Sequence, residues 1–143
     1  MSTVIMHAVV SLDGFIADDR DEVGPLFDWY FNGDRPLFEG DDDASHPEGW
    51  HPEADVPFVE DVTEAIRIAR ERAGDGVVAL SAGEAAGHAL ALGLVDVVAM
   101  DVVPVVFGSG KRFFGSIEGQ HLLGDPDIVV QGERVLHLRY PVT

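Results

Sequence analysis

Residues 61–107 constrain the fold most strongly, because helical and strand-like patterns alternate along them. Asp61 and Glu64 have the spacing of a capping box at the start of an amphipathic helix, and Gly74 and Gly76 end that helix. Short continuous apolar runs between glycine turns are typical of buried strands. The predicted order is a helix over residues 61–73, a strand over residues 77–80, a helix over residues 84–92 and a strand-like run over residues 95–107 that Pro104 interrupts.

The two ends of the chain add further strands to this unit. Residues 3–10 are apolar and β-branched, which predicts a buried strand, and residues 25–31 suit a short aromatic helix. Residues 127–131 and 134–140 predict a closing hairpin across Gly132-Glu133. The sequence therefore predicts an α/β sandwich with a mixed sheet whose terminal strands run antiparallel.

Residues 34–55 differ from the rest of the chain in composition. They contain three prolines, three consecutive aspartates and few aliphatic residues, which is typical of a loop. His46 and His51 lie among these carboxylates without helical spacing, so we expect adventitious metal binding there and no dedicated metal site. With 143 residues, the chain is predicted to be a single domain, 1–143, with an irregular acidic loop at about residues 34–56.

The charge of the chain is the best guide to what it does not bind. Nine Lys and Arg residues against 26 Asp and Glu residues give a formal net charge of −17. Such a chain repels phosphate backbones and anionic lipid surfaces, so we expect no nucleic acid and no membrane partner. The sequence has no cysteine, no apolar run of the roughly 18 residues that a membrane helix needs, and no secretory signal pattern, so we expect a cytoplasmic protein.

A strand-to-helix turn is the first candidate anion site. Ser81, Ala82 and Gly83 lead into a helix that starts with Glu84 and Ala85, and backbone N–H groups at such a junction can hold a pyrophosphate. The alternative is an ordinary tight turn. The negative charge of Glu84 in the first turn already stabilises the positive end of the helix dipole.

A glycine turn at residues 108–112 carries the second candidate. It holds Lys111, the only lysine of the chain, followed by Arg112. These two are the only neighbouring basic residues in the sequence. The turn lacks the spacing of a Walker loop and the Ser or Thr after the lysine, which excludes that type of site. We expect the basic pair to meet ligand phosphate or local carboxylates, and Lys111 is a candidate for contact with the substrate.

Carboxylates near the first strand are candidates for catalysis. Asp13 follows that strand and would anchor the nitrogens of a heterocycle; the alternative is an Asx-type turn cap. Asp28 lies between Phe27 and Trp29, which are candidates for substrate contacts. Burial among these rings would raise the pKa of Asp28 and suit a proton donor, whereas the alternative is a solvated helix face.

The histidines outside the acidic loop give no catalytic pattern in the sequence. His7, His88, His121 and His137 are far apart along the chain, and we expect each to sit alone in its own strand or helix. No combination of serine, histidine and aspartate has an interpretable spacing.

Three blocks of sequence together resemble the dihydrofolate-reductase-like superfamily, and within it the RibD C-terminal family of riboflavin biosynthesis reductases. The blocks are Ser-Leu-Asp-Gly-Phe-Ile-Ala at 11–17, Gly-Leu-Val-Asp at 93–96 and Pro-Val-Val-Phe-Gly-Ser-Gly-Lys-Arg-Phe-Phe at 104–114. The resemblance covers about residues 1–33 and 57–140. It implies a three-layer α/β/α sandwich around a mixed, mainly parallel sheet, reduced here by loss of a central segment.

The resemblance also implies an activity. Members of the family typically reduce a small pyrimidine- or pterin-like heterocycle with NADPH, and they often pair as homodimers. Carried over to this sequence, Ala8 and Ile16 would face the nicotinamide, residues 81–85 would receive the pyrophosphate, and Asp13 would lie in the substrate cleft.

Two departures from the family pattern affect the expected cofactor site. The family has a strand ending in a Gly-Arg motif, and a further strand, where this chain has the acidic residues 34–55; no Gly-Arg pair occurs in the sequence. The family's Gly-Gly at the pyrophosphate turn corresponds here to Ser81-Ala82. Losing two charge-assisted phosphate contacts, each worth about 1.5–3 kcal/mol, would weaken NADPH binding on the order of a hundredfold or more.

Three hypotheses follow, in decreasing order of preference. The chain is an NAD(P)H-dependent reductase of the RibD C-terminal type, or it is a relative that has lost the cofactor site and binds a small molecule or runs cofactor-free chemistry. The third hypothesis is an interaction protein in which a second copy covers an exposed sheet edge.

Overall fold

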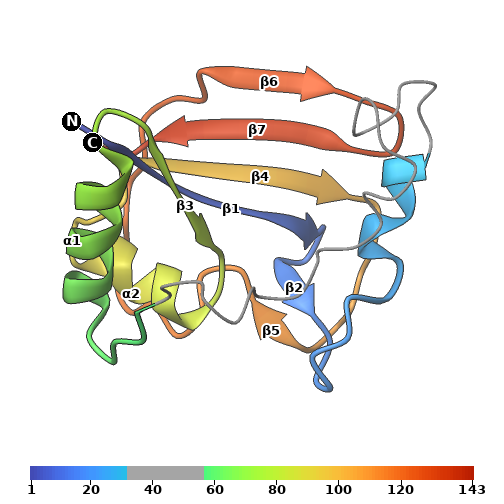
Figure 1. Ribbon diagram of the computed structural model, residues 1–143. Helices are drawn as coiled ribbons and strands as arrows, with labels where there is room; N and C mark the ends of the chain where they lie inside the picture. The colour runs from blue at the N-terminus through green and yellow to red at the C-terminus, as the bar shows by residue number, and fades with distance from the viewer. Residues whose placement is uncertain (32–56) are drawn as a thin grey trace, which may run out of the picture.

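The computed structural model describes residues 1–31 and 57–143 of the chain (Figure 1). These residues form a five-stranded sheet, a two-stranded ribbon and three helices. The predicted acidic loop at about residues 34–56, with His46 and His51, lies outside the described residues. In chain order the elements are β1 (Thr3–Ser11), β2 (Phe15–Ala17), the 3-10 helix η1 (Gly24–Phe31), α1 (Val62–Ala73), β3 (Val77–Ser81), α2 (Glu84–Ala91), β4 (Val97–Val103), β5 (Lys111–Arg112), β6 (Ile128–Gln131) and β7 (Leu136–Pro141).

The large sheet has the strand order β3-β1-β4-β7-β6. β1 pairs in parallel with both β3 and β4, whereas β7 pairs antiparallel with both β4 and β6. The predicted mixed sheet and its closing hairpin are confirmed. Within the large sheet two pairings are parallel and two are antiparallel, because β7 of the C-terminal hairpin pairs antiparallel with both β4 and β6, so this sheet is mixed without a parallel majority.

Local sequence signals explain most of the element boundaries. Asp61 caps α1 by accepting a hydrogen bond from the backbone N–H of Glu64 at 2.8 Å, as the capping pattern predicts. β4 ends at Val103, earlier than predicted, because Pro104 has no N–H for the ladder. The residues of β5 were predicted as a glycine turn; they instead pair antiparallel with β2.

A set of partly exposed hydrogen bonds connects α1 to the start of the sheet. Asp96, from the second sequence block at residues 93–96, accepts a hydrogen bond from the N–H of Val4 at 2.7 Å. Arg70 of α1 donates to the same Asp96 carboxylate at 3.0 Å and to the carbonyl of Ser2 at 2.7 Å. Asp96 therefore ties the beginnings of β1 and β4 to the helix.

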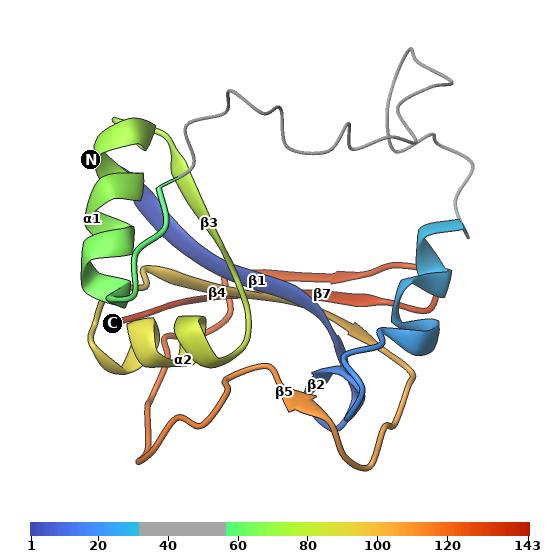
Figure 2. The same ribbon diagram turned by 60° about the horizontal axis from the view of Figure 1, so that its bottom comes forward.

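The two faces of the sheet are covered differently. Side chains alternate along β1, so Val4 and Met6 point to one face, and they are fully buried in a core shared with α1 and α2. On the other face, Val9 packs with Leu26 of η1 in a second, smaller core. Figures 1 and 2 show α1 and α2 together at one end of the sheet and η1 at the opposite end. The three expected layers are thus present, with η1 forming the described part of the third.

None of the helices in residues 1–31 and 57–143 has both the length and the apolar character needed to cross a bilayer.

The packing of α2 gives a test of the fold. A Cβ atom at Gly87 would lie 1.9 Å from the carbonyl oxygen of Phe114, so Gly87→Ala must push α2 away from that segment. We expect the substitution to lower the free energy of unfolding by about 1–3 kcal/mol, measured by urea denaturation. His88→Ala, on the exposed side of the same helix, is the control and should change it by less than about 0.5 kcal/mol. Unchanged stability of Gly87→Ala would contradict this packing.

Candidate functional site

The turn between β3 and α2 is where the sequence predicts a pyrophosphate site. The N–H of Ala82 donates to the carbonyl of His7 at 3.2 Å, and the N–H of Gly83 donates to the carbonyl of Phe113 at 2.8 Å. Two amides of the turn are therefore already bound within the protein. The exposed Ser81 makes no capping hydrogen bond to α2, which has no side-chain N-cap, so the N–H groups of its first turn, around Ala85, are the ones available to a ligand.

The start of α2 and the turn before β5 line the same cavity, of about 240 Å³. Gly83 and Glu84 come from one side, and Gly110, Lys111 and Arg112 come from the other. The structure thus brings together the two glycine turns that the sequence places almost thirty residues apart. Helix N–H groups and two cations are a combination that binds phosphate.

Glu84 places a negative charge in this cavity. Its carboxylate accepts hydrogen bonds from the Ser116 hydroxyl at 2.8 Å and from the Ser116 N–H at 3.0 Å, which lowers the pKa of Glu84 below its ordinary value. The carboxylate is therefore ionised at neutral pH. Lys111 lies 3.7 Å from Asp21 in an exposed ion pair, so the carboxylate of Asp21 partly neutralises its positive charge.

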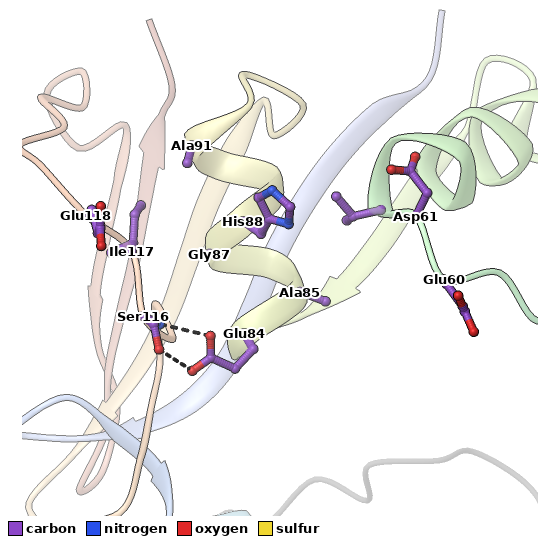
Figure 3. A pocket seen from close by; sticks show the side chains of 11 residues that line it. Glu60, Asp61, Glu84, Ala85, Gly87, His88, Ala91, Ser116, Ile117 and Glu118 are labelled. Atoms are coloured by element: carbon purple, nitrogen blue, oxygen red, sulfur yellow. Dashed lines mark hydrogen bonds between the residues drawn. The ribbon is translucent and has the colours of Figure 1, made fainter.

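A larger cavity, of about 550 Å³, lies between α2 and the beginning of α1 (Figure 3). Figure 3 shows His88 projecting from α2 toward α1, and the Glu84–Ser116 contact at the cavity's edge. Four carboxylates, those of Glu60, Asp61, Glu84 and Glu118, line it. This lining repels phosphate, so the smaller cavity is the better match to an anionic cofactor.

The two residues expected to face a nicotinamide lie close to the pyrophosphate turn. Ile16 on β2 is in reach of Gly83, since a Cβ at that glycine would be 3.5 Å from Ile16 Cδ1. Ala8 and Ile16 are both partly buried against the main core. Ile16 and the turn are therefore parts of one region.

Asp13 holds two loops together. Its carboxylate accepts hydrogen bonds from the Ser11 hydroxyl at 2.6 Å and from the N–H groups of Phe107 at 3.1 Å and Gly108 at 2.8 Å. The bond from Ser11 is the main cause that lowers the pKa of Asp13. Asp13 is thus an ionised acceptor whose oxygens are used by the fold, which favours the turn-cap interpretation over direct substrate chemistry.

The candidates on η1 lie apart from the phosphate cavity. Asp28 is exposed, which corresponds to the solvated-face alternative. Trp29 stacks on Tyr30 with ring centroids 4.2 Å apart, and Phe27 is 5.4 Å from the Tyr30 ring. Phe27 and Trp29 therefore belong to an aromatic cluster on the second face of the sheet, whereas Lys111 belongs to the cavity beside α2.

The expectation that the histidines sit alone is wrong for two of them. His7 on β1 and His137 on β7 both donate hydrogen bonds to Asp101 on β4, at 2.8 Å and 2.6 Å. No local pattern predicts this group, because 130 positions separate the two histidines and only the strand order β1-β4-β7 brings them to one carboxylate. The Trp29 ring lies edge-on to His137, with centroids 5.5 Å apart.

Asp101 is the anionic centre of this group. Its burial acts to raise its pKa, but the hydrogen bonds from His7 and His137 outweigh this effect and lower it. In turn the hydrogen bond to Asp101 raises the pKa of His7. No group of three or more His, Cys, Asp or Glu side chains in the described part of the chain has the arrangement of a metal site.

The solved structures that this chain resembles include riboflavin biosynthesis proteins. A RibD protein from Acinetobacter baumannii matches with a TM-score of 0.66 and 15% identity over 100% of this chain. A diaminohydroxyphosphoribosylaminopyrimidine deaminase/5-amino-6-(5-phosphoribosylamino)uracil reductase from Thermotoga maritima matches with a TM-score of 0.67 and 16% identity over 99% of it. The chain has the dihydrofolate-reductase-like fold of RibD proteins. It covers 58% and 57% of these two longer chains.

A third match aligns over nearly the whole of both chains. A candidate riboflavin biosynthesis protein from Shewanella sp. PV-4 matches with a TM-score of 0.62 and 17% identity, over 99% of both chains. No protein-family model and no curated protein matches the sequence. The resemblance found in the three sequence blocks is therefore confirmed at the level of the fold.

The contacts of Asp13 predict how stability responds to its removal. Asp13→Asn loses the charge that three donors share, so we expect a lower melting temperature at pH 7, measured by calorimetry. Because the pKa of Asp13 is lowered by folding, its contribution is present above its ordinary pKa of 3.8 and is lost as the pH falls through the folded value. The difference from the wild type should therefore shrink in acid. Asp28→Asn, at an exposed site, is the matched control; an equal effect of both variants would contradict the structural role of Asp13.

Proposed function

We propose that the chain is an NAD(P)H-dependent reductase that acts on a small pyrimidine- or pterin-like heterocycle. The cavity between the start of α2 and Lys111-Arg112 is the observation that carries this proposal. Its helix N–H groups and two cations suit a pyrophosphate, and Ile16, a candidate nicotinamide contact, adjoins it. The RibD fold of the chain supports the same activity.

Each part of this region has a role in the proposal. The first turn of α2 and the side chains of Lys111 and Arg112 bind the phosphates, while Ala8 and Ile16 provide an apolar surface for the nicotinamide. NADPH supplies the hydride when it is bound. Asp13 acts as a positioning residue, since it fixes the turn before β2 against Gly108.

The carboxylate of Glu84 favours a second candidate function, that of a relative that has lost NADPH binding. Glu84 is ionised inside the cavity that would hold the phosphates, and its charge opposes theirs. A relative that has lost the cofactor would bind its small molecule without NADPH. The strength of NADPH binding separates the two functions.

A titration with NADPH, followed by tryptophan fluorescence at physiological salt, is the test. For the reductase we expect saturable quenching that excess NADP reverses. Arg112→Gln should weaken binding about tenfold, because one charge-assisted hydrogen bond is lost. Glu84→Gln should strengthen binding, since it removes the opposing charge and keeps the shape of the side chain. Arg134→Gln, with the same charge change in the β6–β7 turn, should leave binding unchanged.

The outcomes of this titration distinguish the candidates. No binding at millimolar NADPH by the wild type, and none by Glu84→Gln, would overturn the reductase and leave the cofactor-free binder. Binding that Arg112→Gln and Arg134→Gln weaken equally would overturn the assignment of the cavity.

We also propose that the chain forms a homodimer through its β6 edge. All four residues of β6 are exposed, Val129 by 59% and Val130 by 53%, and one side of this edge strand has no partner in the described sheet. Unpaired strands of this kind are templates for pairing with a second copy across a two-fold axis. We expect a dimer in sedimentation at micromolar concentration and a monomer for Val129→Lys. Leu122→Lys, a change at another exposed apolar residue, is the control; a wild-type monomer would contradict the proposal.

A further inference from the structure

Two cavities beside α2 adjoin each other, and the proposed function so far uses the smaller one. The cavity of about 240 Å³ that would hold the phosphates and the cavity of about 550 Å³ between α2 and the beginning of α1 are both lined by Glu84 and Ser116. Figure 3 shows these two residues in contact at the edge of the larger cavity. A ligand that fills the smaller cavity and extends beyond it can therefore reach the larger one across this contact.

A dinucleotide is longer than its pyrophosphate, so it must extend from the smaller cavity in two directions. Toward β2 it meets Ile16, whose Cδ1 would lie 3.5 Å from a Cβ at Gly83. In the other direction α2 leads away from Gly83 along Ala85, His88 and Ala91, which all line the larger cavity. A volume of about 550 Å³ is within the ~300–1,000 Å³ that is typical of sites for small ligands. The larger cavity is therefore the place for the adenosine half of the cofactor.

The larger cavity presents negative charge to this half of the cofactor. Glu60 and Asp61 come from the beginning of α1, and Glu118 comes from the segment on the other side of α2 (Figure 3). The described residues that line the cavity include neither lysine nor arginine. The guanidinium of Arg67 on α1 is bound by two carboxylates of its own helix. A 2′-phosphate on the adenosine ribose would therefore meet carboxylates without a compensating cation in the described lining.

We propose that the cofactor of this chain is NADH, and that the carboxylates of Glu60 and Glu118 exclude the 2′-phosphate of NADPH. The proposal rests on the reductase function stated above and deepens it by choosing between the two dinucleotides. A carboxylate near the adenosine ribose accepts a hydrogen bond from the 2′-hydroxyl of NADH, whereas an arginine is needed to hold the 2′-phosphate of NADPH. The residues of the larger cavity fit the first group and not the second.

Glu60 and Glu118 are the two carboxylates of the cavity that the fold does not use. Asp61 is engaged as the cap of α1, and the Glu84 carboxylate is engaged by Ser116. In the described part of the chain, no hydrogen bond or ion pair involves the side chains of Glu60 and Glu118. Both residues are exposed, so the loss of their charge should leave the fold intact.

Parallel titrations with NADH and NADPH, followed by tryptophan fluorescence, measure the preference. In the wild type we expect NADH to bind at least about tenfold more tightly than NADPH, because the 2′-phosphate is repelled by several charges. NADPH should still saturate the protein, since both dinucleotides share the pyrophosphate and the nicotinamide. ADP should displace NADH at a lower concentration than 2′-phospho-ADP does, because these competitors differ in the 2′-phosphate alone.

Charge-removing variants locate the origin of the preference. Glu60→Gln/Glu118→Gln should strengthen NADPH binding about tenfold and bring the two dinucleotides to similar affinity. Glu84→Gln should strengthen the binding of both, since its carboxylate faces the pyrophosphate that they share. Asp28→Asn/Glu133→Gln is the matched control. It makes the same change of charge in η1 and in the β6–β7 turn, at the end of the sheet opposite α1 and α2, and should keep the preference (Figure 1).

The dependence on salt gives a readout that a change of cavity shape would not produce. Repulsion between exposed charges is screened as the ionic strength rises, so the preference of the wild type for NADH should shrink between about 0.05 M and about 0.5 M salt. The contacts of the shared pyrophosphate weaken equally for both dinucleotides and cancel in the ratio of the two dissociation constants. In Glu60→Gln/Glu118→Gln this ratio should change little with salt.

The outcomes separate this inference from the proposed function. Equal affinity of the wild type for both dinucleotides, or tighter binding of NADPH, would reject the inference and keep the reductase. A preference for NADH that Glu60→Gln/Glu118→Gln retains in full would reject the role of the larger cavity. Binding of neither dinucleotide at millimolar concentration would overturn the reductase and this inference with it.

Discussion

The rest of the structure depends on the pairing of β1 with a parallel neighbour on each side. β3 and β4 form backbone hydrogen bonds with the two edges of β1, so β1 is an interior strand. Its alternating side chains therefore point to opposite faces of the sheet. Val4, Met6 and Val10 are fully buried under the helices, and this burial is what holds α1 and α2 in place. The same alternation places His7 on the other face. One strand therefore builds the core and presents the polar group opposite it.

The local balance of charges differs from one cavity or side-chain group to the next, although the chain as a whole is strongly negative. At the start of α2, ionised Glu84 shares a small cavity with Lys111 and Arg112, so a phosphate there depends on a balance of nearby charges of both signs. In the larger cavity, four carboxylates leave no such balance. On the sheet face opposite α1 and α2, Asp101 is paired with two imidazoles, and the hydrogen bond to its carboxylate raises the pKa of His7. A net charge of −17 thus does not exclude anionic or polar ligands at particular sites.

The fold explains what the three sequence blocks do. Asp13 of the first block joins the turn after β1 to the third block through Phe107 and Gly108. Asp96 of the second block joins β1 and α1 through Val4 and Arg70. These residues are readable in the sequence because short hydrogen-bonded turns need particular side chains at fixed positions. Their role in this structure is to fix strands and loops.

The sequence by itself determined the helices, most strands, the closing hairpin and the mixed α/β class, because capping residues, glycine turns and apolar periodicity act over a few neighbouring positions. It also indicated the turn at Ser81-Gly83 and the glycine turn at residues 108–112 as candidate anion sites. Only the tertiary structure decided that these two turns line one cavity, that β5 pairs with β2, and that His7 and His137 share Asp101. The reason is physical: which strands become neighbours is set by burial of whole faces and by hydrogen bonds between distant segments, and no local pattern records that choice.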